Sequence, residues 1–377
     1  MDFKPTYQAA IKRKKEFLSL GLREYSNSRN YDYGPNKRHN VSGLSPYLNN
    51  GLIDIADLAQ ECIDLYGERN VDKYVSELFW GVYWKGYLEL RPTIWTSFKN
   101  DLENLSDYKK SESYKKAVNG LTCIPCFNDW VDELKKYNYL HNHTRMWFAS
   151  IWIFTLELPW QLGAELFMQH LYDGDAASNT LGWRWVAGVQ TQGKHYLASE
   201  WNIKKFTNNR FNNIKLNESA PPKISEKTYS IIKQNFINSE NIEESSLLIF
   251  DNNLSFEFTD FKNKKFKKIY LISNRNRSIK LSEKVMKFKS LLINDQEHRL
   301  KEQSIDCEVI DINEIKNIDE KIIGLYPNVG ENLDYLNTNN LNLNFLYRKL
   351  DQYSWQYCNK GFFNFKNYIP KIIATFS

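Results

Sequence analysis

The sequence predicts a mainly α-helical N-terminal domain followed by a smaller α/β domain with a parallel, Rossmann-like sheet. Three observations lead to this fold class. A chain of 377 residues exceeds one ordinary domain. Apolar residues recur at helical spacing through the first half, and short β-type runs alternate with helical ones after about residue 246. We therefore expect a helical domain over residues 1–215, a linker over 216–245 and the α/β domain over 246–377.

In the first half, the spacing of the apolar residues predicts helices over residues 7–20, 53–90, 127–137 and 159–172. In the second half, runs rich in Ile, Leu, Val and Phe predict strands over 246–250, 268–272, 307–310, 321–325 and 344–347. A long helix is expected between strands at 280–301, and a short one inside the linker at 225–236. Alternation of this kind is typical of a parallel sheet, and the second half contains no GxGxxG or Walker-type loop.

Composition limits the function classes. Hydrophobic residues make up 42% and charged residues 25%, as in ordinary globular proteins, and the net charge of +5 permits a nucleic-acid partner without requiring one. Aromatic residues reach 15%, and all but two of the 11 Trp lie between Trp80 and Trp185. A segment so rich in Trp indicates either a packed helical core or a site where a chromophore or a base stacks.

Cysteine usage and hydropathy indicate a soluble, cytoplasmic protein. Five Cys, an odd number, favour reduced thiols. The chain has no stretch of about eighteen apolar residues that would span a membrane, and its first residues have no apolar signal region. Cys123 and Cys126 have the spacing of half a metal site, but no second pair is near, so we predict no metal.

The most informative stretch is residues 173–185, an acidic turn that follows a predicted helix and leads to Trp183 and Trp185. Upstream, Arg145 lies in an apolar helical run, where a charge needs a partner, and Asp173 is a strong candidate. Small residues in the turn allow a large, flat ligand to approach its backbone. Ser42 and its neighbours precede a helical run, so their free amides are either an ordinary helix start or a place to hold an anion such as a pyrophosphate.

Four motifs, in order, resemble the FAD-binding helical domain of the photolyase/cryptochrome family. Residues 41–48 are similar to the family's TSxLSPYL stretch, and 77–80 to ELxW. Residues 141–146 resemble HNRxRM, and 173–185 resemble DGDxAxNxxGWxW, which is long and specific. The chain is thus identified as similar to this family from about Tyr25 to Trp185.

The resemblance implies FAD as the cofactor. Its binding residues would be Tyr25, Ser42, Gly43, Leu44, Ser45, Arg145, Asp173, Asp175 and Asn179. Arg145 and Asp173 would form a buried ion pair beside the flavin ring, Asp175 would accept from the ring or the ribose, and Asn179 would face flavin N5. A positive charge near the ring favours its reduced, anionic form.

The resemblance also implies a substrate pocket and an electron-transfer chain. The pocket that holds a flipped pyrimidine dimer in repair enzymes would be lined by Glu77, Trp80, Asn142, Met146 and Trp185, which supply stacking surfaces and polar groups. Trp183 and Trp160 match the first two members of the chain that carries electrons to the flavin. Tyr108 lies where the third member is expected.

The chain departs from the family pattern at several positions. Gly81 and His143 stand where repair enzymes usually carry Arg, and Val41 replaces the usual Thr. The loss of two cations weakens contacts with DNA phosphates. Asn142 stands where (6-4) photolyases would show a His-His pair. The family's α/β antenna domain precedes the flavin domain, whereas here α/β sequence follows it, so this second domain is either a permuted antenna-like domain or an unrelated appendage.

The resemblance favours a blue-light-absorbing FAD flavoprotein of the DNA photolyase type, a lyase that repairs pyrimidine dimers by electron transfer from reduced FAD. In that case damaged DNA would be the partner, and a second antenna chromophore, folate or deazaflavin, is conceivable. The alternative is a cryptochrome-like photoreceptor that signals through a protein partner or its C-terminal domain. A third alternative is a flavoprotein that kept the fold and lost the photochemistry.

Overall fold

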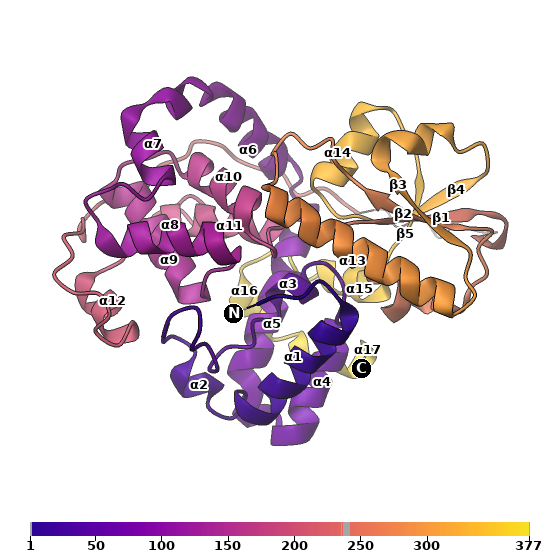
Figure 1. Cartoon of the computed structure of the whole chain (residues 1–377), viewed down its shortest axis with the longest axis horizontal. Coiled ribbons are helices and arrows are strands. Elements are labelled where there is room, and N and C mark those ends of the chain that lie inside the picture. The colour runs from indigo at the N-terminus through magenta and orange to yellow at the C-terminus, as the bar shows by residue number, and fades with distance from the viewer. Residues whose placement is uncertain (1, 235, 237–241, 377) are drawn as a thin grey trace.

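The computed structural model describes residues 2–234, 236 and 242–376 (Figure 1). It confirms the predicted fold class, a helical N-terminal half and a parallel α/β unit after it. Its first half contains α1 (Tyr7–Leu20), α2 (Tyr25–Ser28), α3 (Ser45–Leu48), α4 (Ile55–Tyr66), α5 (Glu68–Glu89), α6 (Thr93–Asn104), α7 (Glu112–Val118), α8 (Pro125–Tyr137), α9 (Asn142–Ser150), a π-helical turn at Ile151–Thr155, α10 (Trp160–His170), α11 (Ala176–Ala187) and α12 (Glu200–Phe206).

Local sequence explains where these helices begin and end. Thr6 caps α1 by accepting a hydrogen bond from the amide of Ala9, and Asp54 caps α4 in the same way. The single helical stretch expected over 53–90 is divided in two at Gly67, whose φ of 77° suits glycine. The division lets α5 turn back across α4 and run through the middle of the helical half.

The second half forms a five-stranded parallel sheet in the order β3-β2-β1-β4-β5. The predicted strands appear within two residues of their expected bounds, because the central strands are largely buried and therefore rich in apolar residues. From the centre of the sheet, β2 and β3 follow β1 on one side, and β4 and β5 lie on the other side. The direction of the strand order therefore changes between β1 and β4, and at such a switch point a crevice forms at the carboxyl ends of the two strands. The elements are β1 (Ser246–Phe250), β2 (Ile269–Ser273), α13 (Glu283–Glu302), β3 (Cys307–Asp311), β4 (Ile322–Leu325), α14 (Glu331–Thr338), β5 (Asn344–Leu346), α15 (Lys349–Trp355), α16 (Phe362–Lys366) and α17 (Ile369–Phe376).

The two halves are packed together by helices from both. Figure 1 shows α13 between the sheet and the helical half, and α13 contacts β2 and β3 on one side and α1 and α10 on the other. Phe288 of α13 stacks on Tyr172 with 4.2 Å between ring centroids. The last three helices leave the sheet and return to the first half, where α15 and α16 pack on α5 and α17 packs on α4.

The prediction of a helix over residues 225–236 is wrong for the residues that the structure describes. Residues 225–234 and 236 form no helix, and 235 lies outside the described residues. The segment instead crosses the first half as an extended strap: the amide of Ile232 donates to the carbonyl of Leu90 at 2.9 Å, and Lys227 binds Asp101. These tertiary bonds use backbone groups that a helix would pair internally.

In the part of the chain that the structure describes, every helix is too short or too polar to cross a lipid bilayer.

Candidate functional site

An ion pair joins two helices of the first half at the acidic turn. Arg145 of α9 and Asp173, between α10 and α11, meet with 2.8 Å between Nη2 and Oδ2. The Nε of Arg145 also donates to the carbonyl of Leu140 at 3.0 Å. Burial opposes the charge of Arg145, but the Asp173 carboxylate outweighs it and the pKa of the guanidinium is raised. The turn therefore holds a fixed positive charge at its edge.

Asp173 collects further donors but keeps one oxygen free. The hydroxyl of Ser45 donates to its Oδ2, and the amide of Asn49 donates to its backbone carbonyl at 2.7 Å. Its Oδ1 is buried and accepts no hydrogen bond from any described residue. A buried polar atom without a partner is uncommon, so this oxygen marks a place where a polar ligand group is missing.

The loop before α3 presents backbone amides at the same place. Gly43 is buried with a φ of 58°, a conformation that favours glycine, while Leu44 is anchored in the core. The amide of Leu44 donates to Oγ of Ser42, whereas those of Gly43 and Ser45 have no acceptor among the described residues. This loop can therefore donate hydrogen bonds to an oxygen-rich ligand.

Asp175 and Asn179 sit at the start of α11. Oδ1 of Asp175 accepts from the amides of Ala177 and Ser178 at 3.0 and 2.9 Å, which makes Asp175 the helix cap. Its Oδ2 accepts from Asn49 at 3.1 Å. Asn179 donates its Nδ2 to the carbonyl of Ala164 at 2.8 Å, which leaves its Oδ1 free to accept.

Tyr25 and Glu77 lie on the neighbouring wall. Tyr25 of α2 is buried against Tyr74 of α5, with 5.0 Å between ring centroids, and burial raises its pKa well above the usual value. Glu77, one turn beyond Tyr74, is reached by solvent yet closely surrounded by protein, and burial raises its pKa too. A carboxyl of this kind is typical of a group that lines a recess.

Trp80 makes a contact that the sequence did not predict. Its ring lies flat against Phe362 of α16, with 3.6 Å between centroids and 11° between planes. Tyr83 of the same helix donates its hydroxyl to the carbonyl of Lys360 at 2.9 Å. The C-terminal helices therefore cover one face of the residue expected to stack on a substrate base.

The other residues expected in the substrate pocket come from α9 and α11. Asn142 is exposed at the start of α9, and Met146 is half-buried one turn later. Trp185 stacks on Tyr196 at 6.0 Å. His143 forms a 3.4 Å contact with that Tyr196 hydroxyl, and burial lowers the pKa of His143, so a neutral imidazole stands where repair enzymes carry a cation.

Trp183 is buried in α11 and packs directly on α10. A Cβ at Gly163 would lie 2.2 Å from its ring, so only glycine allows α10 to approach. Trp160, at the start of α10, is half-buried and stacks on Phe98 at 5.7 Å.

A buried ionic cluster beside the site was missed by sequence reasoning. Asp32 accepts from Arg38 at 3.0 Å and from Thr144 of α9 at 2.6 Å, and Arg38 also binds Glu133 of α8 at 2.5 Å. The cluster ties the loop after α2 to α8 and α9. Asp32 and Arg38 stand in a non-periodic polar loop, so no pattern marked them as buried.

A second polar cluster lies where the two halves meet, at the carboxyl ends of β1 and β4. Lys289 of α13 donates to Asn50 at 2.9 Å, and Arg277 binds Asp251, which follows β1. Glu89, the last residue of α5, accepts from the amide of Val329 at 2.8 Å. These groups surround a cavity of about 50 Å³. Within the described chain, every fully buried polar side-chain atom that lines this cavity has a hydrogen-bond partner.

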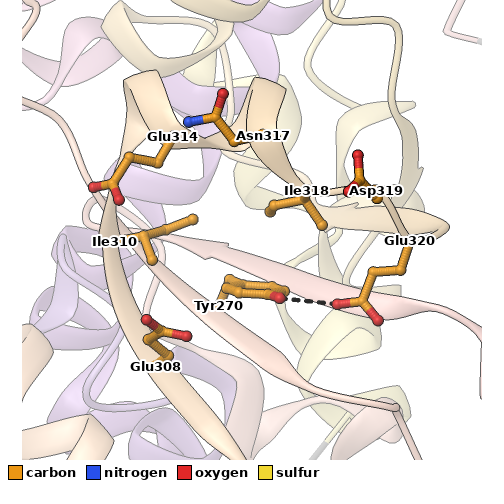
Figure 2. Close-up of a pocket in the computed structure, with 8 residues that line it drawn as sticks. All are labelled: Tyr270, Glu308, Ile310, Glu314, Asn317, Ile318, Asp319 and Glu320. Atoms are coloured by element: carbon orange, nitrogen blue, oxygen red, sulfur yellow. Dashed lines mark hydrogen bonds between the residues drawn. The ribbon is translucent and has the colours of Figure 1, made fainter.

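A larger hollow lies elsewhere, at the edge of the sheet formed by β3. It has a volume of about 380 Å³, and Figure 2 shows the acidic side chains around it, with the hydroxyl of Tyr270 bonded to Glu320 at 2.9 Å. None of the residues singled out from the sequence lines it. Over residues 2–234, 236 and 242–376, no three His, Cys, Asp or Glu side chains are grouped as a metal site would require.

Comparison with known proteins agrees with the family motifs. Residues 74–219 match the family described as the FAD binding domain of DNA photolyase. The chain is 29% identical over 195 residues to the deoxyribodipyrimidine photo-lyase of Vibrio cholerae and 32% identical over 153 residues to that of Streptomyces griseus. These matches cover 48% and 40% of this chain. The chain spans 41% and 33% of the length of these two relatives.

Two solved structures are similar to about half of this chain, at lower sequence identity than the relatives above. A cryptochrome from Synechocystis matches with a TM-score of 0.48 at 20% identity, over 55% of this chain and 44% of that one. A bacterial class III photolyase from Agrobacterium tumefaciens matches with a TM-score of 0.46 at 22% identity, over 54% and 43%.

Proposed function

We propose that the chain is a member of the photolyase/cryptochrome family and a light-driven DNA photolyase, because residues 74–219 match the FAD binding domain of DNA photolyase. In this proposal it binds FAD and repairs pyrimidine dimers in damaged DNA by electron transfer. The observation that carries it is the Arg145–Asp173 pair, with Ser45 beside it and an unpaired oxygen on Asp173.

The residues at this turn fit FAD by the chemistry of their donors and acceptors. Gly43 and Ser45 have free amides suited to phosphate oxygens, and Asp173 has a free acceptor suited to a hydroxyl or a ring N–H. Asn179 offers an unused carbonyl oxygen. When bound, FAD supplies the light-absorbing group that passes an electron to the substrate.

The chain's own residues would hold and tune that group. Arg145 keeps a positive charge at the ring, which favours the anionic reduced form. Asp173 holds the Arg145 side chain in place through a 2.8 Å bond, and Asp175 keeps α11 capped so that Asn179 is presented from a rigid helix. Trp183, packed behind α10, would carry electrons toward the site.

On the substrate side, Glu77, Trp80, Asn142, Met146 and Trp185 would receive the flipped dimer. Desolvation by the surrounding protein raises the pKa of Glu77, and its carboxyl would form a hydrogen bond with the edge of a base. Trp185 and the free face of Trp80 would provide stacking surface.

One observation favours a cryptochrome-like photoreceptor instead. Phe362 covers one face of Trp80, and the imidazole of His143 and the small Gly81 leave the rim without two expected cations. A pocket so altered is less suited to phosphate contacts and couples the flavin domain to the C-terminal helices. The partner would then be a protein or this chain's own second half.

A folate or deazaflavin antenna does not fit the cavity between the two halves. Its volume of about 50 Å³ is far below the roughly 300–1,000 Å³ of small-molecule sites, and its buried polar groups pair with one another. The proposal therefore rests on FAD alone. It keeps residues 1–215 as the flavin domain, 216–245 as a linker and 246–377 as the α/β domain, which is either a permuted antenna-like domain or an unrelated appendage. All five Cys are free, which favours a cytoplasmic location.

The proposal is tested by cofactor content and repair. Purified protein should show a flavin absorption spectrum, and Asp173→Asn should lose most of it because Arg145 is left without its charge partner. After chemical reduction, blue light should restore dimer-containing DNA. Bound flavin without light-dependent repair would contradict the photolyase and favour the photoreceptor.

Two variants make the cofactor test specific. Asp319→Asn removes a carboxylate at the remote hollow and should keep the wild-type flavin content. Ser45→Ala removes a single hydroxyl and should weaken flavin binding while the protein stays folded, as judged by circular dichroism. Wild-type protein that binds no flavin would overturn the proposal.

A further inference from the structure

Among the described residues, one oxidisable ring contacts the indole of Trp183. Its indole contacts the rings of Phe148, Phe167 and Trp152, at 6.3, 5.1 and 6.2 Å between centroids. A phenyl ring holds its electrons too tightly to be oxidised by an indole radical cation. Trp152, in the π-helical turn after α9, can exchange an electron with Trp183.

From Trp152 the rings continue to the surface. Its indole lies edge-on to Tyr114 of α7, with 6.1 Å between centroids, and Tyr114 is half-buried. Three oxidisable rings from α11, the π-helical turn and α7 are thus in consecutive contact. By contrast, the ring contact of Trp160 within the described chain is with Phe98, and Tyr108 has none there.

The charge of a buried carboxylate, that of Glu165, acts on the last ring. Burial and the charge of Glu165 raise the pKa of Tyr114 to about 12, so the neutral phenol keeps its proton until it is oxidised. Lys109 holds Oε1 of Glu165 at 2.7 Å. Oε2 of the same carboxyl is buried without a hydrogen-bond partner among the described residues.

We propose that Trp183, Trp152 and Tyr114 form an electron-transfer branch from the protein surface to the flavin site. The inference rests on the proposed function. Trp183 gives one electron to the light-excited flavin, Trp152 refills Trp183, and Tyr114 refills Trp152 while its phenolic proton passes to solvent, which reaches the half-buried side chain. A thiol in solution then returns one electron and one proton to Tyr114 and is left as a thiyl radical.

The test compares two tyrosines in the flavin-loaded protein. Tyr114→Phe removes a hydroxyl that makes no hydrogen bond with any described residue, and Tyr108→Phe is its matched control. Under blue light without a thiol, wild type should show a tyrosyl radical in electron paramagnetic resonance, which Tyr114→Phe abolishes and Tyr108→Phe keeps. A tyrosyl radical that survives Tyr114→Phe overturns the branch.

Trp152 is tested by replacement and rescue. Trp152→Phe should slow flavin photoreduction severalfold, whereas Trp152→Tyr, which keeps an oxidisable ring, should restore most of the rate. Both variants lose the bond from the indole to the carbonyl of Pro159, so a purely structural effect would slow both alike and overturn the proposal. Trp130→Phe, at a buried Trp whose Nε1 has no partner within the described chain, should not change the rate.

The branch and the proposed function fail in different ways. Photoreduction that is lost in Trp160→Phe and unchanged in Trp152→Phe overturns the branch alone. Wild-type protein without flavin, or with flavin that light does not reduce, overturns the proposed function and the branch with it.

Discussion

The ring of Phe362 lies flat on that of Trp80, with 3.6 Å between centroids, although one belongs to α16 and the other to α5. Phe362 is 5% exposed, whereas the next residue, Phe363, is 82% exposed. The C-terminal helices are therefore part of the wall that supports the flavin domain, since one ring of α16 is buried there and its neighbour points away.

Phe362→Ala should destabilise the protein by about 3–5 kcal/mol, the usual cost of removing a buried phenyl ring. Phe363→Ala should change the free energy of unfolding by less than about 0.5 kcal/mol, as exposed positions do. Urea unfolding of both variants measures the difference. Equal effects would show that α16 does not contribute its buried ring to the folded state.

Replacing each of two glycines in the α10–α11 pair by alanine should change the stability of the protein in opposite directions. Gly163→Ala places a methyl group 2.2 Å from the Trp183 ring, and such overpacking costs about 1–3 kcal/mol. A methyl group at Gly182 would enter open space, with no atom within 4 Å, so Gly182→Ala should gain up to about 1 kcal/mol of helix stability. Thermal unfolding of flavin-free protein measures both, and a stabilised Gly163→Ala would contradict the packing described.

Glu89 should make stability fall as pH rises toward neutrality. Burial raises its pKa to about 7 from the ordinary 4.5, so the folded protein binds its proton more tightly than the unfolded chain does. The stabilisation is complete below pH 4.5 and is lost by about pH 7. At about 1.4 kcal/mol per pH unit it amounts to about 3 kcal/mol.

Glu89→Gln should flatten this part of the pH profile, because the amide carries no titrating proton. Glu16→Gln, at an exposed position of α1, should leave the profile as in wild type. Urea unfolding at several pH values between about 4.5 and 7.5 measures both, and an unchanged slope in Glu89→Gln would refute the assignment.

Breaking the buried ionic cluster around Asp32 should lower the free energy of unfolding substantially. Asp32→Asn removes the charge that faces Arg38, and loss of one partner of a buried pair costs about 3–5 kcal/mol. Burial disfavours the ionised carboxylate, yet Arg38 and its other partners hold the pKa of Asp32 well below the usual value. The stability that Asp32 contributes is therefore present at neutral pH and is lost as pH falls.

Asp107→Asn provides the control, since Asp107 pairs with Lys110 where the two side chains are 89% and 81% exposed. Exposed pairs contribute little, so chemical unfolding should show no measurable change. A cost at Asp107 as large as that at Asp32 would contradict the difference in burial.

Sequence patterns located the regular elements well because periodicity is a local property. The five strands appear within two residues of the bounds that their apolar runs predicted, and α1 spans the expected residues. The pattern failed at 225–234, where Ile232 bonds to Leu90 across the helical half. A short polar segment has little preference of its own, so distant acceptors decided its conformation.

For the site, the motifs named side chains that the structure brings together, such as Arg145, Asp173 and Ser45. They could not place Phe362 on Trp80 or Trp152 against Trp183, because neither contact has a spacing in the sequence. The ring of Trp152 reads as an ordinary core residue until its two oxidisable neighbours are known.

The sequence by itself determined the fold class and the parallel strands, because both depend on local spacing, and its motifs named the residues that we propose bind a flavin. Only the tertiary structure decided which aromatic rings touch, which carboxylates are buried, and how α16 closes against α5. Those contacts join residues far apart in the chain, and their geometry depends on how whole helices pack, which no short stretch of sequence specifies.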